Sequence, residues 1–122
     1  MPNDFSSVQE ALLREGKVGT QYWVSWPEHL QYFNAQGLAA LAADQGLVQV
    51  DLVSDFPIDW FLFCAPANYV ADPSVGKDCH DARMRIEQLL FDTTLDGTAE
   101  LYRALARMGL GRNLVALFTA EA

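Results

Sequence analysis

The sequence predicts one domain of mixed helices and strands, of class α/β or α+β, spanning residues 1–122. Hydrophobic residues make up 51% of the chain and charged residues 20%, a composition typical of folded domains. Apolar residues recur at helical spacing in several segments and alternate with other residues in two more, which predicts helices and strands respectively. A chain of this length buries enough surface for one modest core. We therefore expect the elements to pack as a single domain.

The N-terminal part is predicted to be a short helix followed by a loop. Residues 6–15 carry apolar side chains on one side, and Ser6 or Ser7 is placed to cap the helix. Residues 20–33 are rich in aromatic side chains and contain Pro27, a pattern that favours irregular structure.

Residues 34–54 are predicted to form a helix–strand unit. Asn34 is a good N-cap for a helix over residues 35–45, and Gly46 is a typical C-terminal stop. Residues 47–54 alternate in character and predict a strand. The helix is expected to bury Leu38, Leu41 and Ala42. The strand is expected to place Val48, Val50 and Leu52 on one face.

Residues 58–110 are predicted to be a largely helical crossover. Residues 58–64 fit either a helical turn or a strand, while residues 65–77 contain two prolines and a glycine and are expected to be loop. Residues 78–91 and 98–108 then show helical periodicity.

The second of these helices has candidate signals at both ends. Asp96 or Thr98 is placed to cap its start, and Gly109 is placed to end it. The G-x-G of Gly109 and Gly111 follows a helix and precedes a strand, which is the wrong order for a nucleotide-binding loop. The helix is expected to bury Leu101, Leu105 and Met108.

Residues 111–122 are predicted to be a terminal strand unit, with the strand itself over residues 113–119. Its side chains alternate, with Leu114, Ala116 and Phe118 on one face and Val115 and Leu117 on the other. Two strands alone do not form a stable sheet in water. Either residues 58–64 add a third strand, or a partner supplies the rest of the sheet.

The charge distribution argues against a nucleic-acid partner. The net charge is −8, and residues 1–76 hold nine acidic and two basic residues. A protein that binds the phosphate backbone of a nucleic acid needs a basic stripe, and the sequence has none. No apolar run approaches the roughly 20 residues that span a bilayer, and the N-terminus is polar. We expect a cytoplasmic protein without a membrane partner.

Few residues have the spacing of a catalytic or metal site. Cys64 lies in an apolar run and is expected in the core, whereas Cys79 stands beside His80 near the start of a helix. The two histidines have no third ligand at zinc-binding spacing, so no metal site is predicted. His29 is the candidate general base, although a histidine that ties the loop to the next helix is the more ordinary interpretation. Arg112, with Asn113, is placed to pair with a carboxylate.

Two segments, residues 2–9 and 22–34, mix polar and aromatic side chains more closely than a core requires. Buried polar side chains need hydrogen-bond partners, so this mixture is typical of a pocket wall. The first segment begins at residue 2, and we expect the part of the fold that would precede it to be absent from this chain. The polar members are Asn3, Asp4, Gln9, His29 and Asn34, and the aromatic members are Phe5, Tyr22, Trp23, Trp26, Tyr32 and Phe33.

An ordered series of motifs runs through almost the whole chain. They are PNDFSSVQ, then YW-x₃-PEHLQYFN, then DFP, then NYV-x-DP-x-x-GK-x-x-H-x-x-R-x-x-x-E, and finally GLGRNLV. In this order the motifs resemble the C-terminal, substrate-side half of class I S-adenosylmethionine-dependent methyltransferases. The resemblance implies a partial Rossmann-like fold in which PNDF directly follows the fifth strand. Residues 47–54 would be the sixth strand and residues 113–119 the seventh, antiparallel to its neighbours.

The same resemblance implies where an acceptor substrate would bind. The substrate-facing residues would be Asn3, Asp4, Tyr22, Trp23, His29, Tyr32 and Phe33, with His29 as the catalytic candidate. The glycine-rich loop and the acidic ribose ligand of the family are absent from this sequence. We therefore expect no cofactor to bind this chain alone, although S-adenosylmethionine is the cofactor that the resemblance implies.

Two functions follow as hypotheses. In the first, the chain is the methyl-acceptor side of a methyltransferase and is inactive until a cofactor-binding half is supplied. In the second, it is a stand-alone homodimeric module that binds a small ligand or a partner without catalysis, and self-association covers its open sheet edge.

Overall fold

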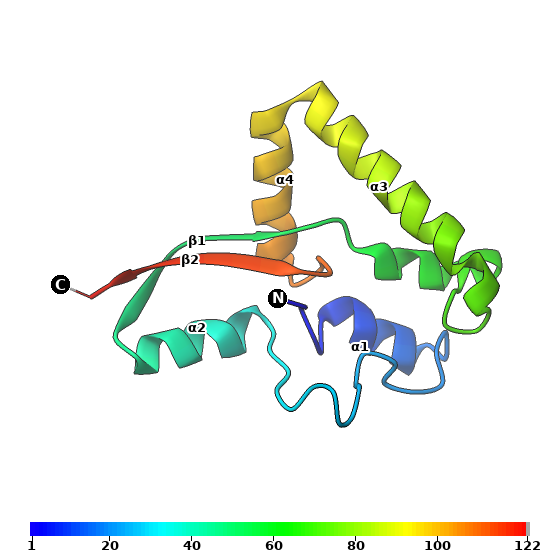
Figure 1. The fold of residues 1–122 in the computed structure, drawn as a ribbon, viewed down its shortest axis with the longest axis horizontal. Helices are drawn as coiled ribbons and strands as arrows, with labels where there is room; N and C mark the ends of the chain where they lie inside the picture. The colour runs from blue at the N-terminus through cyan, green and yellow to red at the C-terminus, as the bar shows by residue number, and fades with distance from the viewer. Residues whose placement is uncertain (122) are drawn as a thin grey trace.

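A computed structural model describes residues 1–121, in which helices surround a small antiparallel sheet (Figure 1). This arrangement confirms the α+β alternative of the predicted class. The predicted terminal unit, residues 111–122, ends one residue outside the described part. The helices are α1 (Ser7–Arg14), α2 (Ala35–Asp44), α3 (Gly76–Thr93) and α4 (Leu95–Met108), the strands are β1 (Leu47–Ser54) and β2 (Leu114–Ala120), and the 3₁₀ turns are η1 (Ile58–Phe63), η2 (Ala65–Ala67) and η3 (Pro73–Val75).

Side-chain caps fix the starts of the first two helices as predicted. The Gln9 amide donates to Ser6 Oγ at 3.3 Å while the Ser6 amide donates to Gln9 Oε1 at 3.0 Å, a reciprocal capping box. The Gly37 amide donates to Asn34 Oδ1 at 2.9 Å. These local bonds satisfy N–H groups that a helix leaves without an internal partner.

The two later helices differ from prediction at their starts. The cap of α4 is Thr94, whose Oγ1 accepts from the Gly97 amide at 3.2 Å, so the predicted caps Asp96 and Thr98 are wrong. The Thr98 hydroxyl instead donates to the Thr94 carbonyl from inside the helix. The third helix, α3, begins at Gly76 and is longer than predicted.

No helix within residues 1–121 combines the length and the apolar character needed to cross a membrane.

The sheet has two strands, because residues 58–63 form η1 instead of a third strand. The strands β1 and β2 pair antiparallel, with Leu52 opposite Ala116. A β-bulge between Gln49 and Asp51 interrupts the ladder, so the predicted regular alternation of β1 does not hold along its whole length.

Helices α2 and α4 lie on opposite sides of the strand pair (Figure 1). The alternation predicted for β2 is confirmed, since Leu114 is buried while Val115 and Leu117 are 60% and 58% exposed. The buried faces predicted for the helices are only partly confirmed. Ala42 and Leu105 are buried, whereas Leu41, Leu101 and Met108 are exposed. These exposed positions show that the sheet and its helices are incompletely covered in this chain.

The best-buried cluster lies between α1 and η1, away from the sheet. Its centre is Leu12 against Leu62, with Val8 and Val18 beside them. Cys64 was predicted to belong to the core and is exposed, because the chain leaves η1 at this residue and turns into η2.

Residues at the N-terminus form a second, very short ladder with β2. The Met1 nitrogen donates to the Leu114 carbonyl at 2.8 Å, and the Leu114 amide donates back to the Met1 carbonyl at 2.6 Å. Pro2 pairs with Asn113 in an antiparallel bridge. The beginning of β2 is therefore paired on both sides, while among residues 1–121 the remainder of β2 pairs with β1 alone.

Candidate functional site

Polar side chains gather at one end of the sheet. Residues 1–3 and β1 both run antiparallel to β2, so their carboxyl ends lie at the same end of the sheet. Asn3 and Asp4 follow the first segment, and Asp55 follows β1. This end of the sheet is the candidate site, because these polar side chains meet there.

Arg112 is the cation at the centre of this end of the sheet. Its NH1 lies 3.5 Å from Asp4 Oδ1, and its Nε lies 3.9 Å from Asp59 Oδ2. Both carboxylates are buried, and Tyr69 donates its hydroxyl to Asp59 Oδ1 at 2.8 Å. Burial raises the pKa of Asp4, and the neighbouring guanidinium of Arg112 opposes that rise. The site thus holds two buried carboxylates around one arginine.

Asp55 joins the end of β1 to the start of β2. Its two carboxylate oxygens accept from the backbone and side-chain nitrogens of Asn113 at 2.8 and 2.7 Å. The guanidinium of Arg83 on α3 lies 3.5 Å from the same carboxylate. The prediction that Arg112 and Asn113 pair with carboxylates is therefore confirmed, with Asp4 and Asp55 as the partners.

Aromatic rings pack edge to face beside Asn3 and Asp4. Phe5 contacts Trp23 and Tyr32 with ring centroids 5.5 and 6.2 Å apart, and Trp23 contacts Tyr22 at 5.2 Å. Phe5 has a φ of 53°, a left-handed conformation that is uncommon for a residue other than glycine. The predicted association of the NDF segment with the aromatic loop is present in the fold.

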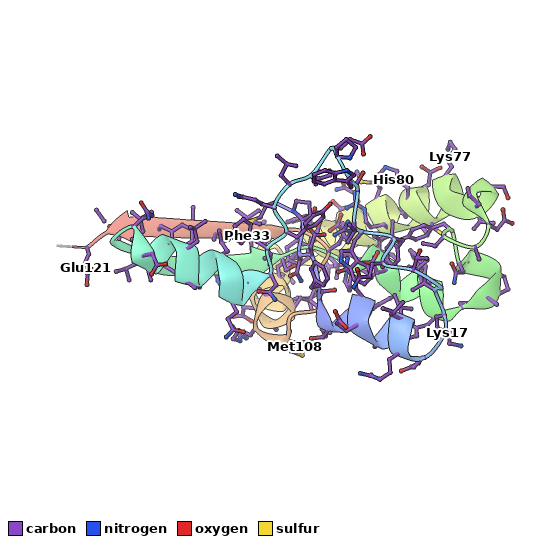
Figure 2. The ribbon with its side chains drawn as sticks, turned by 90° about the horizontal axis from the view of Figure 1, so that it is seen from below. Lys17, Phe33, Lys77, His80, Met108 and Glu121 are labelled. Carbon is purple, nitrogen blue, oxygen red and sulfur yellow. The ribbon has the colours of Figure 1, made fainter. Side chains whose placement is uncertain are left out.

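His29 and Phe33 lie differently from the other predicted residues. His29 is exposed, and its ring centroid is 6.2 Å from that of Tyr32. Trp26, in the same loop, is 77% exposed and does not line a pocket wall. The Phe33 backbone carbonyl accepts a hydrogen bond from the Asp4 amide at 2.9 Å, so Phe33 is joined to the site through its main chain. Figure 2 shows the side chains crowded around the middle of the molecule, near Phe33 and α1, while α2 and the strands extend toward Glu121.

Several buried polar atoms of this region have no hydrogen-bond partner among the described residues. They are Asn3 Oδ1, Gln9 Nε2, Tyr22 OH and Trp23 Nε1. A buried donor or acceptor without a partner destabilises the fold by about 1–3 kcal/mol. These atoms are polar groups to which a ligand or water could bind.

The remaining chemical candidates are structural or solvent-exposed. Cys79 is buried, donates its thiol to the Ala67 carbonyl at 3.3 Å, and has a pKa raised by burial and by Asp78. A protonated thiol is a poor nucleophile. His80 is exposed on α3 (Figure 2). Within residues 1–121 no three histidine, cysteine or acidic side chains come together as a group that could hold a metal ion.

Two residues of this site were not predicted from the sequence. Asp59 and Tyr69 are separated by ten positions, and they meet because the chain folds back after η1, which packs against α1. An isolated aspartate at the start of an apolar run, as in Ile58–Phe63, was the one available signal for a buried charge.

Comparison with protein-family models, with curated proteins and with solved structures finds no match for this chain.

Two partly buried tyrosines, Tyr69 and Tyr22, predict a loss of stability at alkaline pH. Burial, followed by the charge of Asp59, raises the pKa of Tyr69 above its ordinary value of 10.0, and the same causes act on Tyr22. A raised folded pKa means that the unfolded chain loses the proton first, so this stability is present below pH 10 and falls as pH rises above it. We expect Tyr69→Phe to make the fall above pH 10 shallower. At pH 7 the variant should be about 1 kcal/mol less stable, since one hydrogen bond is lost.

Urea unfolding at several pH values, followed by circular dichroism, measures both effects. Tyr32→Phe is the control, because Tyr32 bonds to backbone groups and not to a carboxylate. An unchanged slope above pH 10 in Tyr69→Phe would show that Tyr69 does not stay protonated in the folded chain.

Proposed function

We propose that this chain supplies the methyl-acceptor side of a class I S-adenosylmethionine-dependent methyltransferase and is inactive without a cofactor-binding half. The observation that carries the proposal is the pairing of β2. An antiparallel segment, Met1–Asn3, lies on the side of β2 that faces away from β1, and within β2 it pairs with the first residue, Leu114. A strand leading into Met1 along the same line would place β2 between two parallel neighbours, as the resemblance implies.

The sequence and exposure of β2 support the same arrangement. Its residues, LVALFTA, include no charge and no proline. Natural edge strands are usually protected by charges, prolines or bulges, whereas strands buried on both sides are continuously apolar. The bulge in this sheet lies on β1, and the exposed Val115 and Leu117 lie on β2. The composition of β2 is therefore that of a central strand.

The position of the predicted acceptor residues also supports the proposal. Asn3 and Asp4 come directly at the carboxyl end of the Met1–Asn3 segment, and Trp23 packs against Phe5 beside them. Methyl transfer depends chiefly on the alignment of the acceptor with the donor. Buried Asn3 and Asp4 would hold polar groups of the acceptor, and the aromatic rings would restrict its orientation. S-adenosylmethionine, when bound to the missing half, would supply the electrophilic methyl group.

In this proposal His29 acts from the exposed loop. Burial raises the pKa of Asp4, and the charge of His29 opposes that rise less strongly than Arg112 does, so His29 and Asp4 interact electrostatically. An exposed imidazole can act as a general base and accept a proton from an acceptor group. His29 would therefore orient or deprotonate the acceptor once the loop lies over it.

Hydrogen exchange on β2 tests the proposal. The Leu114 amide points to the Met1 side, so the amides of Ala116 and Phe118 point to the same open side. We expect them to exchange rapidly in the isolated chain, which should show no saturable S-adenosylmethionine binding by calorimetry. In a chimera that joins the cofactor half of a class I methyltransferase, ending at its fifth strand, to Met1, we expect roughly hundredfold slower exchange at both amides and binding of S-adenosylmethionine.

Two outcomes would count against the proposal. One is a folded chimera in which the Ala116 and Phe118 amides still exchange rapidly. The other is micromolar binding of S-adenosylmethionine by the isolated chain. The Val115 amide, which points toward β1, is the internal control in both proteins.

The open edge of β2 also favours a second candidate function, the homodimeric module. Two copies could pair their β2 strands around a two-fold axis and cover the same edge. This alternative predicts that light scattering gives twice the chain mass at micromolar concentration, with the Ala116 and Phe118 amides already protected. A monomeric mass together with rapid exchange would exclude it.

A further inference from the structure

A hollow of about 220 Å³ lies beside the turn formed by Asn3, Asp4 and Phe5 (the NDF turn). It is bounded by the start of α1, the start of α2 and the end of α4. Figure 2 shows these three helix ends meeting near Met108. Phe5 and Met108 give the hollow apolar walls, and Asn3 lines it with polar atoms. His29 does not line the hollow, but Asn3 and Phe5 belong both to the hollow and to the proposed acceptor site.

One side of the hollow presents hydrogen-bond donors. Ala35 and Gln36 at the start of α2 line the hollow, and their amides donate to no group in residues 1–121, because the Asn34 side chain caps the Gly37 amide instead. The N-terminal end of a helix carries a partial positive charge and favours a carboxylate. Arg107, which forms no ion pair with a described carboxylate, adds a cation at the rim.

The end of α4, which also lines the hollow, carries unpaired hydrogen-bond acceptors. The carbonyls of Arg107 and Met108, at the C-terminal end of α4, accept no hydrogen bond from the described residues. Such an end carries a partial negative charge and favours a cation. Asn3 is 1% exposed, donates its Nδ2 to the Gly111 carbonyl at 2.8 Å, and has an Oδ1 without a partner. A ligand that donates protons would satisfy this buried acceptor.

We propose that this hollow binds the ammonium and carboxylate groups of a free α-amino acid with an apolar side chain. The carboxylate accepts from the Ala35 and Gln36 amides. The ammonium group donates to the carbonyls at the end of α4 and to Asn3 Oδ1. The apolar side chain packs between Phe5 and Met108. A simple anion would satisfy only the donor side, and a simple amine only the acceptor side.

Titration of the ¹⁵N-labelled chain with L-leucine tests this proposal. We expect saturable shifts of the Gln36 and Gly109 amide signals. N-acetyl-L-leucine, which lacks the ammonium group, and L-leucinamide, which lacks the carboxylate, should each bind at least about tenfold more weakly, a loss of about 1.4 kcal/mol. Equal binding of either analogue, or the absence of saturable shifts with leucine, would overturn the proposal.

A proline at Ala35 removes one donor without removing the helix. Proline is favoured at the first position of a helix, and Asn34 has the extended conformation, φ −104° and ψ −179°, that precedes proline. We expect Ala35→Pro to weaken leucine binding about threefold to tenfold, whereas the matched control Gln36→Ala keeps its amide and its affinity. Unchanged affinity in a folded Ala35→Pro chain would contradict the placement of the carboxylate.

Discussion

Replacing Gly111 by alanine is expected to destabilise the fold by about 3 kcal/mol, because a Cβ at this position has no room. It would overlap Ser54 Oγ and lie 2.8 Å from the Asp55 carbonyl oxygen. Gly111 is buried where the turn before β2 crosses the end of β1, and the Gly111 carbonyl also accepts the side-chain amide of Asn3. Accommodating the methyl group requires these backbones to separate. Thermal unfolding should show a midpoint lower by roughly 10 °C.

A control and a rescue variant make this prediction specific. Gly19→Ala is the matched control, since a Cβ there meets no atom within 4 Å and the residue has no left-handed conformation. Ser54→Gly in the Gly111→Ala background removes the overlapping side chain and should restore part of the lost stability. A Gly111→Ala chain as stable as the Gly19→Ala chain would show that β1 and this turn do not approach so closely.

The sequence predicted the local elements better than their environment. Asn34 caps α2, and Gly109 ends α4 with a φ of 71°, because capping depends on residues a few positions apart. Residues 58–64 could not be decided from periodicity, because a short apolar run fits both a strand and a tight helical turn. Their conformation depends on the packing of Leu62 against Leu12, fifty positions earlier in the chain.

The candidate site was predicted in the same uneven way. The NDF turn and Trp23 were found because polar and aromatic residues are neighbours in the sequence. Arg112 was identified only as an arginine that could pair with a carboxylate, and its bond to Asp4 spans 108 positions. The burial of Asp59 depends on the same long-range closure. Pairings at such separations leave no periodic signal in a single sequence.

Replacing Asp55 by alanine is expected to destabilise the fold by about 2–3 kcal/mol, because it removes the acceptor that joins three elements. Asn113 would lose the partners of its backbone and side-chain nitrogens, and Arg83 would lose an anion. Both donors are partly buried, so water replaces the carboxylate only in part. Since Asn113 opposes Pro2, the short ladder of the candidate site should loosen as well. Urea unfolding at neutral pH measures the loss of stability, and exchange of the Asn3 amide, which donates to the Arg112 carbonyl, measures the loosening.

Asp44→Ala separates the effect of these bonds from the effect of charge. Asp44 is exposed at the last turn of α2 and accepts no side-chain hydrogen bond from the described residues. Its removal changes the net charge by the same amount, and an acidic residue at a helix C-terminus is slightly unfavourable. Asp44→Ala should therefore be neutral or slightly stabilising. If both variants shift stability equally, the effect of Asp55 is one of net charge. If only Asp55→Ala loses stability and protection at Asn3, the carboxylate holds the end of β1, the start of β2 and the N-terminal ladder in the geometry that the proposed acceptor site requires.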